Sequence, residues 1–253
     1  MEAPQRFPTL LCSVSQHPTT GCMTAHRRTV GVVIAAGGRG DRAGAGDLKQ
    51  FREIAGVPML LRAIRPFAAH PRVDEIVVSL PPATVSDPPA WLKQLVGRRM
   101  KLVAGGDTRA ASVARGVAVL SAECATVLVH DAARPFVSRE TIDAVLEHAC
   151  RGTCAIAAVP VTDTIKRTDR GGTCVVETIE RAGLWRAQTP QGFPRNTLEI
   201  AYEAAGESSQ AATDEAALVE AAGFTVELVT DSATNMKITT SEDFAIAEAL
   251  AIQ

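Results

Sequence analysis

Short apolar runs alternate with segments of helical spacing along most of this chain. Residues 30–36 are continuously apolar and rich in β-branched side chains, which predicts a buried strand, and a glycine-rich stretch follows it. Residues 58–69 place apolar side chains at helical spacing behind Pro58, which predicts a helix with proline in its first turn. The regular pattern therefore begins with a strand and a helix.

The same alternation continues to residue 161. We expect strands at residues 73–80, 101–103, 127–130 and 155–161, and helices at residues 84–96, 108–120 and 138–150. Such alternation at short spacing is typical of a parallel sheet with helices on both faces. Ligands of open sheets of this kind bind at the carboxyl ends of the strands, so the loops after residues 36, 103, 130 and 161 should meet at one crevice.

Two β-branched runs with polar alternation, at residues 162–168 and 173–179, interrupt this pattern. Asp169-Arg170-Gly171-Gly172 joins them, which is a hairpin signal. Because such a hairpin has few partners for its edges, we expect an arm at about residues 162–180 that pairs with a second subunit. A hairpin folded back on its own sheet is the alternative.

Helices at residues 194–205, 213–222 and 241–252 and a strand at residues 225–229 complete the expected chain. The predicted fold class is α/β, with a Rossmann-like, mostly parallel sheet, helices on both faces and a protruding β-hairpin dimerisation arm. We expect residues 29–253 to form one domain and residues 1–28 to form a disordered leader, with the native start at Met1 or Met23.

The composition changes this picture by excluding several classes of protein. Hydrophobic residues make up 46% of the 253 residues and charged residues 21%, which excludes disordered, collagen-like and coiled-coil chains. Because 26 Lys and Arg stand against 28 Asp and Glu, we expect no basic field that would hold a nucleic acid. No apolar run approaches the roughly 18 residues that a membrane span needs, so we expect no membrane protein.

The six cysteines lie without the spacing of zinc ligands. Cys124 and Cys154 stand at the starts of apolar runs, which predicts buried free thiols rather than disulfides. This pattern favours a reducing compartment, the cytoplasm.

The glycine-rich stretch after the first strand indicates phosphate binding. Gly38 and Gly40, with Ala43, formally match a dinucleotide-binding fingerprint, but the expected acid about 20 residues later is missing. No Gly-Lys-Ser/Thr follows either, which excludes a Walker loop. Glycines allow backbone amides to approach phosphate oxygens, and Arg42 and Lys49 would add positive charge over them. Solvated surface cations are the alternative.

Several segments in order along the chain resemble one enzyme family. They are Ala36-Gly37-Gly38-Arg39-Gly40-Asp41-Arg42 followed by Lys49, Gly105-Gly106-Asp107-Thr108-Arg109-Ala110-Ala111-Ser112-Val113, Val129-His130-Asp131-Ala132-Ala133-Arg134-Pro135, Asp163-Thr164-Ile165-Lys166, Arg181-Ala182-Gly183-Leu184-Trp185, Gln188-Thr189-Pro190-Gln191, Thr213-Asp214-Glu215 and Asn235-Met236-Lys237-Ile238-Thr239. The ordered set resembles the 2-C-methyl-D-erythritol 4-phosphate cytidylyltransferases of the non-mevalonate isoprenoid pathway, which belong to the nucleotidyltransferases. The chain departs from that pattern at Gly37, Leu48 and Thr234, where the family has Ala, Pro and often an acidic residue.

The resemblance implies a nucleotidyltransferase domain that moves CMP from CTP to methylerythritol phosphate, with Mg²⁺ as cofactor and a homodimer as the active form. Catalytic roles then fall to Arg42, Lys49, Arg181 and Lys237. Contacts with the nucleotide fall to Ala36, Gly37, Gly38, Gly40, Gly106, Asp107, Ser112, Asp131 and Ala132, with Asp131 also the metal ligand. Contacts with the second substrate fall to Arg134, Thr164, Arg181, Thr189, Thr213 and Lys237.

Plainer interpretations of three of these residues stay open. Ser112 could be a polar residue of an early helical turn, and Asp131 could cap the turn that follows it. Arg181 could be an exposed ion-pairing residue, although its place beside an apolar segment favours burial against an anion. His130 we interpret as structural.

Two other functions also stay open. One is a related enzyme with another acceptor, such as ribitol phosphate, or another nucleotide. The other is a protein that binds a nucleotide without turnover, which the joint presence of Arg42, Lys49, Asp131 and Lys237 argues against, because a binding protein has no transition state to stabilise.

Overall fold

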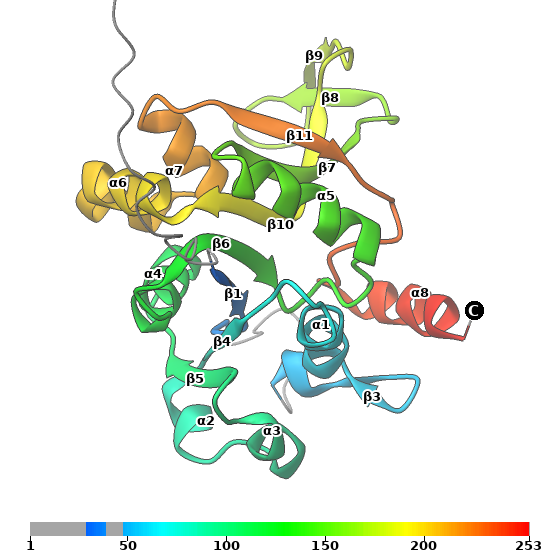
Figure 1. Cartoon of the computed structure of the whole chain (residues 1–253). Coiled ribbons are helices and arrows are strands. Elements are labelled where there is room, and N and C mark those ends of the chain that lie inside the picture. Colours follow the sequence, from blue (N-terminus) through cyan, green and yellow to red (C-terminus); the bar gives the residue numbers. More distant parts are fainter. Residues whose placement is uncertain (1–28, 39–47, 253) are drawn as a thin grey trace, which may run out of the picture.

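The computed structural model describes residues 29–38 and 48–252. Among these residues, seven strands form a central sheet in the order β11-β7-β10-β6-β1-β4-β5 (Figure 1). The strands are β1 (Thr29–Ala35), β4 (Glu75–Leu80), β5 (Met100–Ala104), β6 (Cys124–Asp131), β7 (Cys154–Pro160), β10 (Trp185–Pro194) and β11 (Val226–Thr230). Within the described chain, β10 runs antiparallel to its neighbours β6 and β7, and the other pairs of this sheet are parallel. The predicted mostly parallel sheet is confirmed.

Helices cover both faces of the sheet, as the alternation predicted. They are α1 (Met59–Ala68), α2 (Pro82–Ser86), α3 (Ala90–Leu95), α4 (Arg109–Val119), α5 (Arg139–Cys150), α6 (Arg195–Ala205), α7 (Glu215–Ala221) and α8 (Ser241–Ala251). One hydrophobic cluster joins α4, α6 and α7 to the sheet, and another joins α1 and α5 to its opposite face (Figure 1). Two short 3-10 helices, η2 (Lys49–Phe51) and η3 (Gly206–Ala211), and the small pair β2 (Glu53–Ile54) and β3 (Val57–Pro58) complete these elements.

Strand β1 shows why a continuous apolar run correctly predicts a buried strand. Val32 and Ile34 pack into the cluster with α1 and α5, whereas Val33 packs into the cluster with α4 and α6. Successive side chains of a strand point to opposite faces, so a strand covered on both faces needs apolar residues at every position.

Two sequence-based expectations about elements were wrong. The single helix expected at residues 84–96 is divided into α2 and α3, because Pro88 and Pro89 lie between them and proline supplies no N–H to continue a helix. Strand β10, in the middle of the sheet, was not expected at all.

The predicted hairpin is present as β8 (Ile165–Thr168) and β9 (Val175–Ile179), which form their own two-stranded sheet. Its side chains are mostly exposed, and Val175 and Val176 are 61% and 65% exposed. Figure 1 shows it at the top of the molecule, outside the layers of the central sheet. The alternative, a hairpin that joins the central sheet, is wrong for the described chain.

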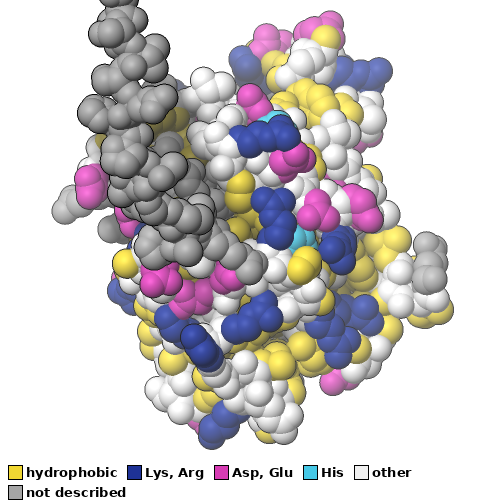
Figure 2. Space-filling model, viewed as in Figure 1, with side chains coloured by type: hydrophobic (Ala, Val, Ile, Leu, Met, Phe, Trp, Pro, Cys, Tyr) yellow, Lys and Arg dark blue, Asp and Glu magenta, His cyan; other side chains and the backbone are white. Residues whose placement is uncertain are grey.

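The surface and the helices also bear on the classes of protein considered. On the face in Figure 2, Lys and Arg side chains are interspersed with Asp and Glu rather than gathered in one basic patch. None of the helices in the described part of the chain has the length and apolar character that crossing a membrane requires.

Candidate active site

A cavity of about 670 Å³ opens at the carboxyl ends of β1, β4, β5 and β6. Its lining residues are Ala35, Gly37, Gly38, Pro81, Pro82, Gly105, Gly106, Asp107, Thr108, Arg109, Ser112, Asp131, Ala133 and Lys237. The loops after β1, β5 and β6 meet here, as expected for the carboxyl ends of parallel strands. The loop after β7 does not line this cavity and leads instead to the hairpin, while Pro81 and Pro82 after β4 form part of the wall.

Glycines and Ser112 pack tightly at one wall of the cavity. A Cβ atom at Gly37 or at Gly105 would lie 2.8 Å from the Ser112 hydroxyl oxygen, so both positions lack room for a side chain. The Gly106 amide donates to that hydroxyl at 3.1 Å, and the hydroxyl donates to the Thr108 carbonyl at 2.9 Å. Ser112 thus shapes the turn before α4, which accords with its interpretation as a polar residue of an early helical turn. The absence of a side chain at Gly37 follows from this close packing.

Asp131, at the end of β6, accepts from two cations. Its Oδ1 accepts from Arg109 Nε at 2.9 Å and its Oδ2 from Lys237 Nζ at 2.7 Å. Burial acts to raise the pKa of Asp131, but the two cations outweigh it and hold the pKa well below its usual range. The carboxylate is therefore ionised throughout the physiological range.

The alternative role of Asp131 as a side-chain cap is not seen. The amide of Arg134 donates to the backbone carbonyl of Asp131 at 3.0 Å, which closes the turn without the carboxylate. The side chain is thus available to the cavity, where Lys237 from a distant segment already meets it.

The donor set at this position fits one divalent cation held jointly with a substrate. In the described part of the chain, no three His, Cys, Asp or Glu side chains gather as metal ligands. Mg²⁺ usually takes one or two carboxylates and completes its coordination with water and substrate phosphates. The Asp131 carboxylate, ionised and facing the cavity, meets that requirement as a single protein ligand.

Lys49 lies beside the segment that carries Lys237. Its Nζ donates to the Ile238 carbonyl, and the Ile238 amide donates to the Ala133 carbonyl at 2.8 Å. Gln50, next to it in η2, donates to the carbonyl of Ala36 at 3.0 Å. The segment after the glycine loop is thus joined to both β1 and the Lys237 segment. Gly40 and Arg42 lie outside the described residues.

Arg134 and Thr189 stand behind the cavity wall rather than in it. Arg134 donates from Nη1 to the Asn235 carbonyl at 2.7 Å and from Nη2 to the Ala187 carbonyl at 3.3 Å. Thr189 is buried, and its hydroxyl accepts from the Asp131 amide at 3.0 Å. Ala132 is also buried, with its amide bonded to the Ala35 carbonyl at 3.1 Å. In this single chain, these residues hold the site together.

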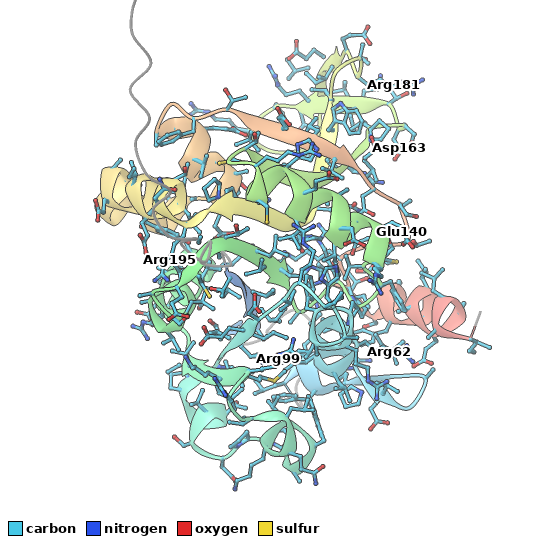
Figure 3. The ribbon with its side chains drawn as sticks, viewed as in Figure 1. Arg62, Arg99, Glu140, Asp163, Arg181 and Arg195 are labelled. Carbon is cyan, nitrogen blue, oxygen red and sulfur yellow. The ribbon has the colours of Figure 1, made fainter. Side chains whose placement is uncertain are left out.

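Three predicted acceptor contacts lie on the surface. Thr164 and Thr213 are exposed, and Arg181 is exposed as well, with its guanidinium bonded to the Thr162 carbonyl. Figure 3 places Arg181 on the hairpin side of the molecule, near Asp163. The expectation that Arg181 is buried is wrong for one chain, because the hairpin it adjoins does not pack on the central sheet.

Two charged residues, Arg109 at the cavity and Glu215 buried behind it, have no role in the predicted site. Arg109 lines the cavity and bridges Asp131 to Glu215, whose carboxylate is fully buried. Both residues lie inside quoted motifs, so the signal that could have found them is a charged residue within a motif otherwise explained by turns and caps.

Comparison with known proteins agrees with this geometry. The family model IspD, 2-C-methyl-D-erythritol 4-phosphate cytidylyltransferase, matches residues 30–253. A relative of that printed name from Alkaliphilus metalliredigens is 39% identical over 87% of this chain and 92% of its own length. The bifunctional enzyme IspD/IspF of Anaeromyxobacter dehalogenans is 48% identical over 90% of this chain, which spans only 58% of that relative.

A solved structure extends the likeness to the fold. The crystal structure of 2-C-methyl-D-erythritol 4-phosphate cytidylyltransferase from Thermus thermophilus has a TM-score of 0.75 and 36% identity, and it covers 89% of this chain and 100% of that chain. Sequence, fold and motif order agree over nearly the same residues, so the chain belongs to the 2-C-methyl-D-erythritol 4-phosphate cytidylyltransferase family.

Proposed function

We propose that this protein transfers the CMP group of CTP to 2-C-methyl-D-erythritol 4-phosphate, giving 4-diphosphocytidyl-2-C-methyl-D-erythritol and pyrophosphate for isoprenoid precursor synthesis. The observation that carries the proposal is the position of Asp131, Arg109 and Lys237 at the carboxyl ends of the strands, in a cavity walled by glycine turns. Family membership supports this acceptor over ribitol phosphate.

The reaction needs charge neutralisation more than it needs a base. The acceptor phosphate has a second pKa of about 6 and is largely dianionic at neutral pH. One of its oxygens attacks the α-phosphorus of CTP, a new P–O bond forms, and the bond from the α-phosphorus to the bridging oxygen breaks as pyrophosphate leaves. Lys237 and Lys49 supply positive charge beside this position, and Arg42 is proposed to add more.

The nucleotide is proposed to lie along the glycine wall. Gly37, Gly38, Gly106 and Asp107 line it, and the tight packing around Ser112 keeps that backbone open to a base and ribose. Asp131 would hold a divalent cation, which when bound draws negative charge away from the phosphates.

The hairpin is proposed as the dimerisation arm. Val175 and Val176 are exposed on it, and the predicted acceptor residues Thr164 and Arg181 lie at its base, away from the cavity of their own chain. An arm that crosses to a partner would bring both to the partner's site. The cytoplasm is the proposed compartment, since Cys124 and Cys154 are buried free thiols.

The test is a pyrophosphate assay with each of the four ribonucleoside triphosphates, Mg²⁺ and either methylerythritol phosphate or ribitol phosphate. Pyrophosphate should appear with CTP and methylerythritol phosphate and should require the added metal. Faster release with ribitol phosphate or another nucleotide would contradict the proposal.

Two variants separate catalysis from nucleotide binding. Lys49→Ala and Arg42→Ala should each lower kcat by about 100-fold or more, because the lost charge acts on the transition state. CTP affinity, measured by calorimetry without acceptor, should change far less. Lys93→Ala, on α3 and outside the cavity lining, is the matched control. Normal turnover in both variants would contradict the proposed roles.

A further inference from the structure

Three successive ion pairs connect four charged side chains, from the buried Glu215 to Lys237 at the cavity. Glu215 at the start of α7 meets Arg109 at the start of α4, Arg109 meets Asp131, and Asp131 meets Lys237. Two of the four are anions and two are cations, so the series as a whole is electrically balanced. Glu215 is 106 residues from Arg109 in the sequence, and the pair forms only in the folded chain.

Glu215 enters this series as a carboxylate. Its side chain is fully buried, and both of its oxygens accept from Arg109 Nη1, at 3.0 Å and 2.8 Å. Tyr202 also donates its hydroxyl to one of them at 3.1 Å. The Arg109 guanidinium can only donate, so both carboxylate oxygens face a cation, and a buried charge of this kind requires its counterion.

Arg109 is held in one orientation by two different anions. Nε donates to Asp131 while Nη1 is occupied by Glu215, and the planar guanidinium therefore cannot turn without breaking one contact. Its Nη2 is buried and makes no hydrogen bond within the described part of the chain. Arg109 itself lines the cavity, so the side chain that holds Asp131 in place belongs to the site.

We propose that Glu215 and Arg109 are positioning residues that set the orientation of Asp131 and the net charge beside it, and thereby its affinity for the divalent cation that accompanies the nucleotide. Glu215 offsets the charge of Arg109, so that Arg109 orients Asp131 without competing fully with the cation. The inference rests on the proposed function, because it assigns a task to residues beside the proposed metal ligand.

The two members of the pair predict opposite effects. Glu215→Gln leaves the charge of Arg109 uncompensated, so Asp131 binds a cation less well. Arg109→Gln removes a competing cation next to Asp131, so a cation binds more tightly although the carboxylate is no longer oriented. The double variant restores the balance. A residue pair that merely stabilises the fold would move all three variants in the same direction.

The experiment measures Mn²⁺ binding to the protein saturated with CTP and without acceptor, by the electron paramagnetic resonance signal of free Mn²⁺. Relative to the wild-type chain, Glu215→Gln should raise the Kd about tenfold and Arg109→Gln should lower it severalfold. The double variant should lie between the two single variants. Tyr202→Phe, which removes a hydroxyl but no charge, should stay within about twofold.

Turnover gives a second readout with acceptor present. Arg109→Gln should lower kcat while it tightens metal binding, a split that loss of folded protein does not produce. If Glu215→Gln does not fold, Arg109→Gln alone must still show tighter Mn²⁺ binding. Weaker binding in Arg109→Gln, or shifts of one sign in every variant, would overturn the inference. Absence of turnover with CTP and methylerythritol phosphate in the wild-type chain would instead overturn the proposed function.

Discussion

His130 shows how one buried side chain can orient the end of β6, where Asp131 lies. Its Nε2 lies 2.9 Å from the Arg134 carbonyl, which can only accept, so Nε2 carries the proton. Nδ1 therefore accepts from the Thr189 hydroxyl at 2.9 Å, and that hydroxyl in turn accepts from the Asp131 amide. Burial lowers the pKa of His130 to about 4, so the ring is neutral at physiological pH. The structural interpretation of His130 agrees with these contacts.

This buried histidine predicts a loss of stability in mild acid. Its pKa is about 4 in the folded chain against about 6.5 when unfolded, so the unfolded chain binds the extra proton first as the pH falls. The stabilisation is complete above pH 6.5 and is lost as the pH falls toward 4. Between pH 7 and pH 5 the loss should be roughly 2 kcal/mol, measured by urea unfolding.

The control separates titration from packing. His130→Gln should be less stable at pH 7 but should lose less stability between pH 7 and pH 5. Val145→Ala, which shortens a fully buried side chain on α5, should also be less stable yet keep the wild-type pH dependence. A pH dependence unchanged in His130→Gln would refute the assignment.

At the scale of the element, the start of α4 matters most for the site. Thr108 caps this helix by accepting from the Ala111 amide at 3.1 Å, and the first turn then presents Arg109 and Ser112 to the cavity. The cap therefore fixes both the helix and the cavity wall.

Replacing Thr108 by Ala should lower stability by about 1 kcal/mol and should also weaken CTP binding. Ser138→Ala removes the equivalent cap of α5, whose hydroxyl accepts from the Thr141 amide at 3.1 Å, and Ser138 does not line the cavity. Thermal unfolding and calorimetric titration with CTP should show similar stability losses in both variants but weaker binding only in Thr108→Ala. Equal CTP affinities in the two variants would show that the α4 cap has no part in the site.

The elements also reveal what a local pattern can predict. Apolar periodicity located the parallel strands because burial on both faces demands it, as β1 illustrates. The apolar periodicity did not predict strand β10, because the buried residues at its centre are polar. Gln191 donates to Asp214 at 2.8 Å and accepts from the Ala216 amide at 3.2 Å, and Gln188 donates to the Asn235 carbonyl at 3.1 Å. Partners this distant in the sequence leave no local periodicity.

The site residues also fall into those that a local motif predicts and those that only the fold brings together. The motifs that mark strand ends and turns predicted Asp131, Ser112 and Lys237, which line the cavity. The pairing of Arg109 with Glu215 depends on the fold that brings the start of α7 to the start of α4, and no spacing along the chain encodes it.

At the scale of the whole molecule, the hairpin is the feature whose exposed position no contact within the described chain accounts for. An isolated two-stranded sheet is only marginally stable, and its exposed valines leave apolar surface in water. A second surface that covers these valines would remove that cost. Val176→Asp should therefore convert a dimer into monomers, as measured by light scattering during gel filtration. Val96→Asp, the same change at an exposed valine after α3, should leave the mass unchanged. A wild-type monomer would contradict the dimerisation arm.

Subunit mixing tests whether the arm completes the partner's site. Lys49 bonds to the Ile238 carbonyl, next to the cavity-lining Lys237 of its own chain, whereas Arg181 lies by the hairpin. Lys49→Ala and Arg181→Ala should each be nearly inactive alone. If every site combines Lys49 of one subunit with Arg181 of the other, a mixed dimer carries one intact site and one with both defects. Random exchange makes half of the dimers mixed, so activity should recover to about a quarter of the wild-type value. Sites built within single chains would leave a defect in every site of every dimer, and mixing would then restore no activity.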